Sequence, residues 1–261
     1  MSETFSIYLA RESGLHRLHP LTKLALAGFS MVAGLALPGL WLTYAAFAVV
    51  MLPVAAWGKI LGAYARAVWR LLLPFAVSLL LVQGLFWTGG TPLIRVGPLS
   101  LKLEGVIFAV RSSGRILLVT GGFLLLALST RPDALMIALA QRGMPRSIAY
   151  IVLTTLQIVP RFQAKADAIL DAQRSRGLET EGNILRRVRA LLPLIVPLVL
   201  GSILDIEERA IALEARGFSH PGPKTSLLVL ADSASQVAAR WGLLAGMVVL
   251  IVARLVAGCW A

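Results

Sequence analysis

Long apolar runs recur along this 261-residue chain, and they constrain its fold more than any other feature. The runs that qualify as membrane spans cover residues 21–37, 40–57, 71–87, 104–128 and 241–260. A hydrocarbon core of about 30 Å requires roughly 20 apolar residues in a helix, and in lipid every backbone polar group must be satisfied internally. The sequence therefore predicts an all-α membrane protein with about five transmembrane helices.

The composition supports this class and narrows the partners. The chain is 57% hydrophobic, has a mean hydropathy of +0.80 and carries a net charge of +12. In a soluble protein such a charge favours nucleic acid, but in a membrane protein it marks cytoplasmic loops and contacts with anionic lipid headgroups. No basic patch is interleaved with exposed aromatic residues, so membrane lipids are expected as partners and nucleic acid is not.

The sequence contains no complete motif for binding a metal, a cofactor or a nucleotide. Cys259 is the single cysteine, which excludes a disulfide within the chain and a thiolate metal site. The stretch 222–225 has the end of a phosphate-binding loop without its first glycine or the required spacing. His16, His19 and His220 lack metal-ligand spacing with any acidic partner. No cofactor is therefore expected, and the chain is not expected to bind ATP itself.

The distribution of charge predicts the orientation of the spans. The turn at 38–39 is neutral, whereas the predicted loop 57–70 carries Lys59, Arg66 and Arg70. The positive-inside rule places that loop and the N-terminus in the cytoplasm. The domains expected are a four-span region at 1–130, cytoplasmic or interfacial coupling helices at 131–224, and a C-terminal transmembrane helix at 225–261.

The region 131–224 holds most of the acidic residues of the chain and is predicted to be helical. One helix is expected from Arg131 to Arg142, and a longer one from about 147 to 176 with a kink at Pro160. The apolar run 191–204 is too short to span comfortably, so it is predicted to be an interfacial or protein-covered helix. A separate amphipathic helix is expected at 205–216.

Two copies of a short pattern occur in this region: Ser175-Arg176-Gly177 and Ala215-Arg216-Gly217. A glycine just past a helix end adopts the left-handed conformation without a Cβ clash, and an arginine suits the negative end of the helix dipole. A guanidinium placed there can bind a carboxylate through two hydrogen bonds. The alternative is an ordinary helix stop with a basic last residue.

Paired small-Arg-Gly motifs that follow several hydrophobic helices resemble the transmembrane T component of energy-coupling-factor (ECF) transporters. This family belongs to the vitamin- and metal-uptake branch of the ABC transporters. The stretches 15–24, 143–146 and 158–162 are also similar to it. Ser175 stands where the family usually has Ala, and a small residue is kept.

The resemblance implies a non-catalytic coupling subunit of the bacterial inner membrane. Such a subunit joins two cytosolic ABC ATPases to a separate substrate-capture membrane protein, which holds the substrate. The residues implied to dock the ATPases are Ser175, Arg176, Gly177, Ala215, Arg216 and Gly217. Arg176 and Arg216 would each dock one ATPase.

The sequence leaves two other functions open, a conventional ABC permease and an intramembrane transferase. A conventional ABC permease has one coupling loop of the Glu-Ala-Ala…Gly type, which 214–217 matches poorly. An intramembrane transferase would use carboxylates such as Asp167 and Asp171 to hold magnesium and a diphosphate. That chemistry needs a denser acidic cluster, so a solvated helix face is the favoured interpretation for these two residues.

Two further features concern the spans. Arg111 and Arg115 lie four residues apart on one helix face, either at membrane depth, where charges mark contacts or pathways, or near the headgroups if the span begins at about 116. Small residues are expected to permit close contact between spans. These residues are Gly28, Ala33, Gly34, Gly121 and Gly122.

Overall fold

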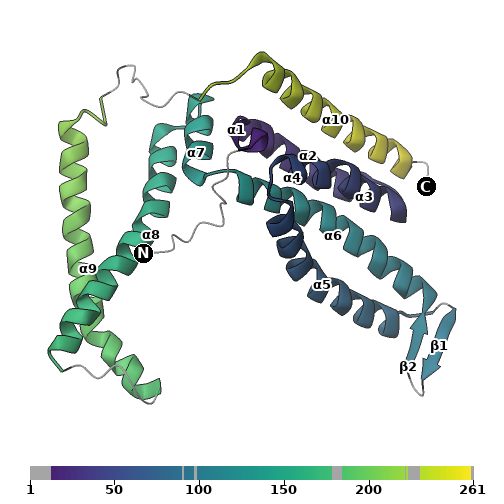
Figure 1. The fold of residues 1–261 in the computed structure, drawn as a ribbon, viewed down its shortest axis with the longest axis horizontal. Helices are drawn as coiled ribbons and strands as arrows, with labels where there is room; N and C mark the ends of the chain where they lie inside the picture. The colour runs from purple at the N-terminus through teal and green to yellow at the C-terminus, as the bar shows by residue number, and fades with distance from the viewer. Residues whose placement is uncertain are drawn as a thin grey trace. The chain divides into compact units, whose positions relative to one another are not determined.

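A computed structural model describes residues 13–89, 91–96, 99–177, 184–220, 222 and 230–259. Figure 1 shows a chain that is mostly helical in this part. In order, its elements are α1 (Gly14–Arg17), α2 (Pro20–Ala36), α3 (Leu40–Ala46), the π-helical turn η1 (Phe47–Met51), α4 (Leu52–Trp57), α5 (Leu61–Phe86), β1 (Pro92–Val96), β2 (Leu99–Lys102), α6 (Leu103–Ser129), α7 (Pro132–Gln141), α8 (Arg146–Ser175), α9 (Ile184–Ala215) and α10 (Ala234–Cys259).

The chain divides into two compact units. One lies within Pro145–Val229 and contains the α8–α9 hairpin, and the other contains the remaining helices and is called the bundle here. α7 belongs to the bundle, because it contacts α2.

The bundle carries the membrane-spanning helices. Within the described residues, 4 helical stretches are long and apolar enough to cross a bilayer, and α2 is a shorter apolar helix. The stretches are Leu40–Trp57, Leu61–Phe86, Leu103–Ser129 and Ala234–Val256. Large apolar side chains such as Val49, Val82 and Val248 remain exposed along them, as expected of surfaces that face lipid. The predicted class of all-α membrane protein is therefore confirmed.

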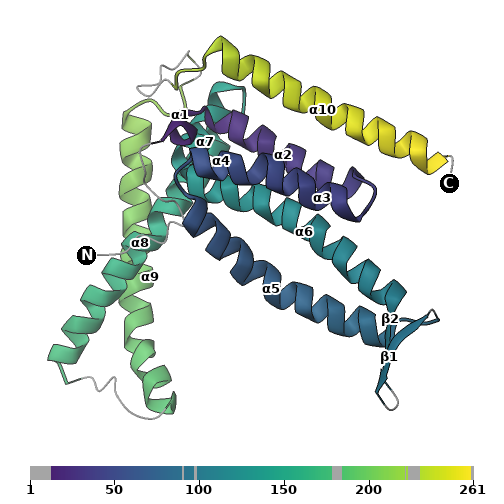
Figure 2. The same cartoon turned by 45° about the vertical axis from the view of Figure 1, so that its right-hand side comes forward.

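Helix α6 forms the centre of the bundle. It packs against α2, α3 and α5 (Figure 2), and Leu118 and Leu125 are almost completely buried along it. A Cβ at Gly122 would overlap Ser30 of α2, and one at Gly34 would press on the α6 backbone at Arg115. The close helix contact expected of small residues is thus present at Gly34 and Gly122, where it joins α2 to α6.

Gly28 behaves differently from the other small residues. No atom of the described residues lies within 4 Å of the position that its Cβ would occupy, so Gly28 makes no close helix contact within this part of the chain. The residue instead lines an open groove between α2 and α10.

The buried ends of α2 and α6 are joined by a charged side chain. Lys23 near the start of α2 donates from Nζ to the carbonyl oxygen of Ser129 at the end of α6, at 2.7 Å. This contact satisfies a carbonyl at a helix end, where no backbone donor is available. Farther back in α6, Arg111 is exposed and Arg115 is half-buried, and both lie inside the candidate span that begins at Leu103.

The predicted loop at 57–70 is wrong. Only Gly58, Lys59 and Ile60 separate α4 from α5, because Lys59 adopts a positive φ of 54° and turns the chain. Arg66 and Arg70 lie on exposed positions of α5, where a charged side chain does not interrupt the helix. Beyond α5, β1 pairs antiparallel with β2 and forms a short hairpin.

The predicted division of 191–216 into two helices is also wrong. A single helix, α9, runs from Ile184 to Ala215 and includes both Pro193 and Pro197. An internal proline removes one backbone hydrogen bond and bends a helix, but it does not force the helix to end. The predicted helix around Pro160 does follow the expected bounds, as α8 extends from Arg146 to Ser175.

Candidate functional site

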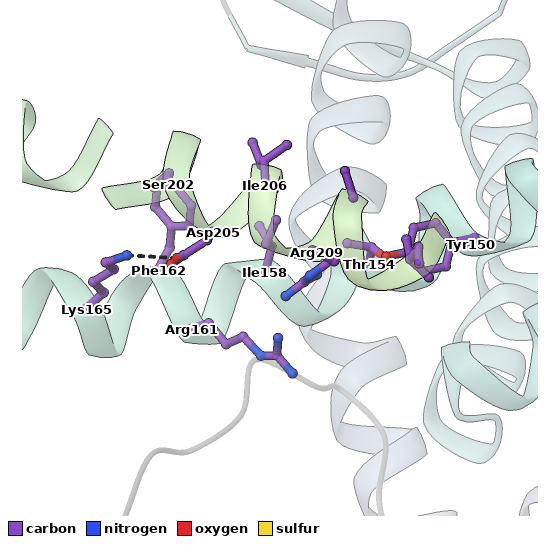
Figure 3. A pocket seen from close by; sticks show the side chains of 12 residues that line it. Tyr150, Thr154, Ile158, Arg161, Phe162, Lys165, Ser202, Asp205, Ile206 and Arg209 are labelled. Atoms are coloured by element: carbon purple, nitrogen blue, oxygen red, sulfur yellow. Dashed lines mark hydrogen bonds and ion pairs between the residues drawn. The ribbon is translucent and has the colours of Figure 1, made fainter. Parts of the chain in front are cut away.

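Helices α8 and α9 form an antiparallel hairpin. At one end, the ring of Tyr150 near the start of α8 packs on the ring of Phe218 just after α9, with centroids 5.2 Å apart. Farther along, Lys165 Nζ lies 2.8 Å from Asp205 Oδ2 (Figure 3). These two contacts fix the pairing of the helices, because they join residues of α8 and α9 in opposite order along the chain.

A groove of about 500 Å³ lies between the two helices. Figure 3 shows Ile158 and Phe162 of α8 and Ile206 of α9 along it, with Arg161 and Arg209 among its polar residues. Its lining is mainly apolar. Lys165 and Asp205, which form an ion pair, are among the charged residues that line it. The hairpin therefore offers apolar surface together with charged groups.

Both helices of the hairpin end in the expected Arg-Gly geometry. Gly177 follows α8 with φ +90° and Gly217 follows α9 with φ +71°, in the left-handed region that glycine adopts without strain. The amide of Gly217 donates to Glu214 O at 2.8 Å, and the amide of Phe218 donates to Leu213 O at 3.0 Å. These bonds satisfy carbonyls of the last helical turn, as in a Schellman motif.

Arg176 and Arg216 are both exposed. Among the described residues, no hydrogen bond or ion pair involves either side chain. Ser175 donates from its hydroxyl to Asp171 O at 3.0 Å inside α8, and Ala215 is the last residue of α9. The sequence pattern thus places two free guanidinium groups at two helix ends, within the part of the chain that the structure describes.

The two arginines lie at opposite ends of the hairpin. Arg216 is close to Tyr150 at the start of α8, because Phe218 packs on that ring. Arg176 follows the last residue of α8, a helix of 30 residues. At 1.5 Å per residue, about 40 Å of helix separates them.

The structure also contains a third Arg-Gly helix end, at the end of the helix expected from Arg131 to Arg142. Arg142 follows α7, Gly143 has φ +101°, and the amide of Met144 donates to Leu139 O at 3.2 Å. Here the arginine has a partner in its own chain: Arg142 Nη2 lies 2.7 Å from Asp232 Oδ2. The repetition of Arg-Gly-apolar after an apolar helix was the signal available in the sequence.

Asp232 receives a second arginine from α10. Arg240 Nη2 also lies 2.7 Å from Asp232 Oδ2, and the Arg240 side chain is only 11% exposed. Hydrogen bonds from Arg240, and then from Arg142, hold the pKa of the Asp232 carboxyl below its ordinary value, against the opposing effect of desolvation. Asp232 and Arg240 therefore tie α7 to α10, and sequence reasoning assigned neither of them a role.

The remaining sequence candidates occupy ordinary positions. Asp171 pairs with Arg174 at 3.4 Å, and both side chains are exposed. His16 shares a hydrogen bond of 2.7 Å with the Ser13 hydroxyl, and the His19 ring accepts from the amide of Leu21 at the start of α2. The two histidines thus take part in helix starts.

Comparison with known proteins gives a consistent picture. The family model CbiQ, described as cobalt transport protein, matches residues 11–227. The energy-coupling factor transporter transmembrane protein EcfT of Lacticaseibacillus paracasei is 30% identical over 233 residues, which cover 85% of this chain and 88% of that protein. The EcfT proteins of Listeria innocua and Thermosediminibacter oceani are 30% and 28% identical, over 81% and 90% of this chain and 83% and 92% of their own lengths.

Proposed function

The chain belongs to the CbiQ family of cobalt transport proteins and EcfT transmembrane proteins, and we propose that it is the coupling subunit of an ECF-type importer. It is an integral protein of the bacterial inner membrane. In the proposed complex it joins two cytosolic ATPases to a substrate-capture membrane protein that takes up a vitamin or a metal ion. ATP hydrolysis is assigned to the ATPases, and this chain transmits their motion.

The observation that carries the proposal is the free state of Arg176 and Arg216. Both follow long helices of the hairpin and both are exposed, and neither side chain has a partner among the described residues. Arg142, at the third Arg-Gly end, binds the carboxylate of Asp232. That pair is an example within the same chain of what a guanidinium at such an end does when a carboxylate is present. We assign the carboxylates for Arg176 and Arg216 to the ATPases.

The separation of the two ends supports one ATPase for each arginine. About 40 Å of helix is more than the width of a single binding groove for a helix end, which is about 10–12 Å across a helix with its side chains. Ser175 and Ala215 precede the arginines, and small side chains there leave room for a partner surface to approach the guanidinium. Gly177 and Gly217 end the helices, so that each arginine lies at a helix terminus.

The hairpin also supplies a surface suited to a membrane-protein partner. Large apolar side chains of α9 are exposed in the described region. They include Ile195, Val196, Val199, Leu200, Ile203, Leu204, Ile206 and Ile211. We assign this surface to the capture protein, because exposed apolar surface of this extent marks an interaction site. The Tyr150–Phe218 and Lys165–Asp205 contacts allow the hairpin to transmit motion as one body.

The test is reconstitution. The chain is co-expressed with ABC ATPases and a candidate capture protein from the same organism, and ATPase activity and uptake are measured for each combination. We expect ATP hydrolysis only when the ATPases are present, and uptake only when the capture protein is also present. Hydrolysis by the purified chain alone would contradict the proposal, and uptake without a capture protein would favour a conventional ABC permease.

A further inference from the structure

A groove lies between α2 and α10, in the bundle and outside the hairpin. The two helices run side by side in the same direction (Figures 1 and 2). Near their starts, the His19 amide donates to Gln236 Oε1 at 2.6 Å. Ten residues farther along each helix, Phe29 faces Gly246, where an added Cβ would lie 3.2 Å from the ring. Residues of both helices line this open groove of about 380 Å³ beside these two contacts.

The walls of this groove are apolar and its mouth is basic. Leu24 and Gly28 line it from α2, and Met247 lines it from α10. Arg142 and Arg240 line it at the end where α2 and α10 begin. An aliphatic wall with arginines at one end matches an amphiphile better than it matches a soluble ion.

The charge at the mouth is not balanced within the described residues. Arg142 and Arg240 share one carboxylate, that of Asp232, which leaves one positive charge in excess. Each guanidinium gives Asp232 a single nitrogen, Nη2, although an arginine has five donors. The Arg142 side chain is 56% exposed, so its other donors are accessible. His19 lies nearby, and burial lowers the pKa of its imidazole, which disfavours its charged form.

We propose that this groove binds an anionic phospholipid, with its phosphate at Arg142 and Arg240 and one acyl chain along Leu24, Gly28 and Met247. An anionic phospholipid such as phosphatidylglycerol has a net charge of −1, which matches the excess charge at the mouth, whereas the choline of phosphatidylcholine cancels the charge of its phosphodiester. Guanidinium groups bind phosphate oxygens in bidentate geometry. The groove follows about 10 Å of each helix, which accommodates the upper half of an acyl chain.

The surroundings fit a lipid at the membrane surface. Trp241, beside Arg240, is 68% exposed, and tryptophan is enriched at the headgroup level. The charge distribution of the sequence predicts that this end of the bundle is cytoplasmic, on the side where anionic lipids attract basic residues. A bound lipid would bridge α7, α2 and α10, because its contacts come from all three helices.

The first test uses the open space at Gly28. Gly28→Leu would fill the groove without touching the arginines, and Gly62→Leu is the matched control, because Gly62 is also helical, open around its Cβ and outside the groove. Binding of phosphatidylglycerol and phosphatidylcholine with equal chains is measured by native mass spectrometry of the purified chain. We expect the wild-type chain and Gly62→Leu to prefer phosphatidylglycerol, and Gly28→Leu to bind it about ten-fold more weakly.

The second test changes the charge in both directions. Arg142→Gln should reduce the preference for phosphatidylglycerol about five-fold, whereas Asp232→Asn should increase it. A merely structural ion pair would give lower thermal stability in both variants and no opposite shifts in lipid preference. Inorganic phosphate serves as the probe for a simple anion site, and it should neither bind measurably nor displace the lipid.

Three results would overturn the proposal. The first is equal binding of the two lipids by the wild-type chain. The second is unchanged phosphatidylglycerol binding in Gly28→Leu, relative to Gly62→Leu. The third is displacement of the lipid by inorganic phosphate at a similar concentration, which would identify an anion site without an acyl groove.

Discussion

The Arg-Gly end of α7 and the Arg-Gly ends of α8 and α9 share one local structure but differ in their partners. All three have a glycine at positive φ directly after an arginine. In the bundle, Arg142 binds Asp232, which is 90 residues away in sequence. In the hairpin, Arg176 and Arg216 are exposed, and among the described residues neither binds a carboxylate.

The comparison separates two consequences of the same motif. The sequence Arg-Gly ends a helix and exposes a guanidinium near its last carbonyls, whatever lies around it. Whether that guanidinium stabilises the fold or remains available depends on a carboxylate elsewhere in the chain. We therefore expect substitutions at Arg142 to affect folding, and substitutions at Arg176 and Arg216 to affect assembly.

The largest effect is expected when the charge of both hairpin arginines is reversed. Arg176→Glu combined with Arg216→Glu should abolish co-purification of the ATPases and uptake, because each glutamate replaces an attraction by a repulsion. Insertion in the membrane should be unchanged. The measurement is the yield of ATPase that co-purifies with the tagged chain from membranes. The double variant Arg174→Glu, Arg209→Glu has the same net charge change outside the motifs, and it should retain the ATPases.

The next effect concerns the fold rather than the assembly. Asp232→Ala should destabilise the bundle by about 2–3 kcal/mol, because it leaves the mostly buried Arg240 without its carboxylate. The control is Asp171→Ala, which removes an exposed pair and should cost less than about 1 kcal/mol. Thermal unfolding of the purified chain measures both. Equal stability of the two variants would contradict the proposed difference between the ion pairs of the bundle and those of the hairpin.

A smaller effect is expected from the helix stop itself. Gly217→Ala places a Cβ on a residue with φ +71°, which should cost about 1–2 kcal/mol. Gly62→Ala, in an exposed helical position, should instead stabilise by about 0.5–1 kcal/mol. If Gly217→Ala weakens ATPase binding while Arg216 is intact, the position of the arginine matters as well as its charge.

The smallest effect is a dependence on pH. The pKa of Asp232 lies below its ordinary value of about 3.9, so its ionised form stabilises the fold. This contribution is present above the ordinary pKa and is lost as the pH falls through the lower pKa of the folded state. As the pH is lowered, the unfolding temperature of the wild-type chain should therefore approach that of Asp232→Asn. Parallel curves would contradict the role of the carboxylate.

The sequence predicted some of these features and not others, for physical reasons. The apolar runs predicted the membrane class, and the two Arg-Gly motifs predicted the helix ends, because both depend on local composition and backbone geometry. Arg66 and Pro193 led to the wrong helix boundaries, since neither a charge on an exposed face nor an internal proline is sufficient to end a helix. The pairing of Arg142 with Asp232 depends on the packing of both α7 and α10 against α2, which no local pattern encodes.

The most direct test of the central claim is the affinity of the ATPases for single-arginine variants of the purified chain. Arg176→Ala and Arg216→Ala should each weaken binding by about 2–5 kcal/mol, or roughly 30-fold or more, because each leaves a carboxylate of the partner unpaired. Arg142→Ala and the nearby control Arg174→Ala should change the affinity by less than about three-fold. If Arg176→Ala and Arg216→Ala bind the ATPases as tightly as Arg174→Ala does, the Arg-Gly ends of the hairpin are helix stops only, and the proposed docking is wrong.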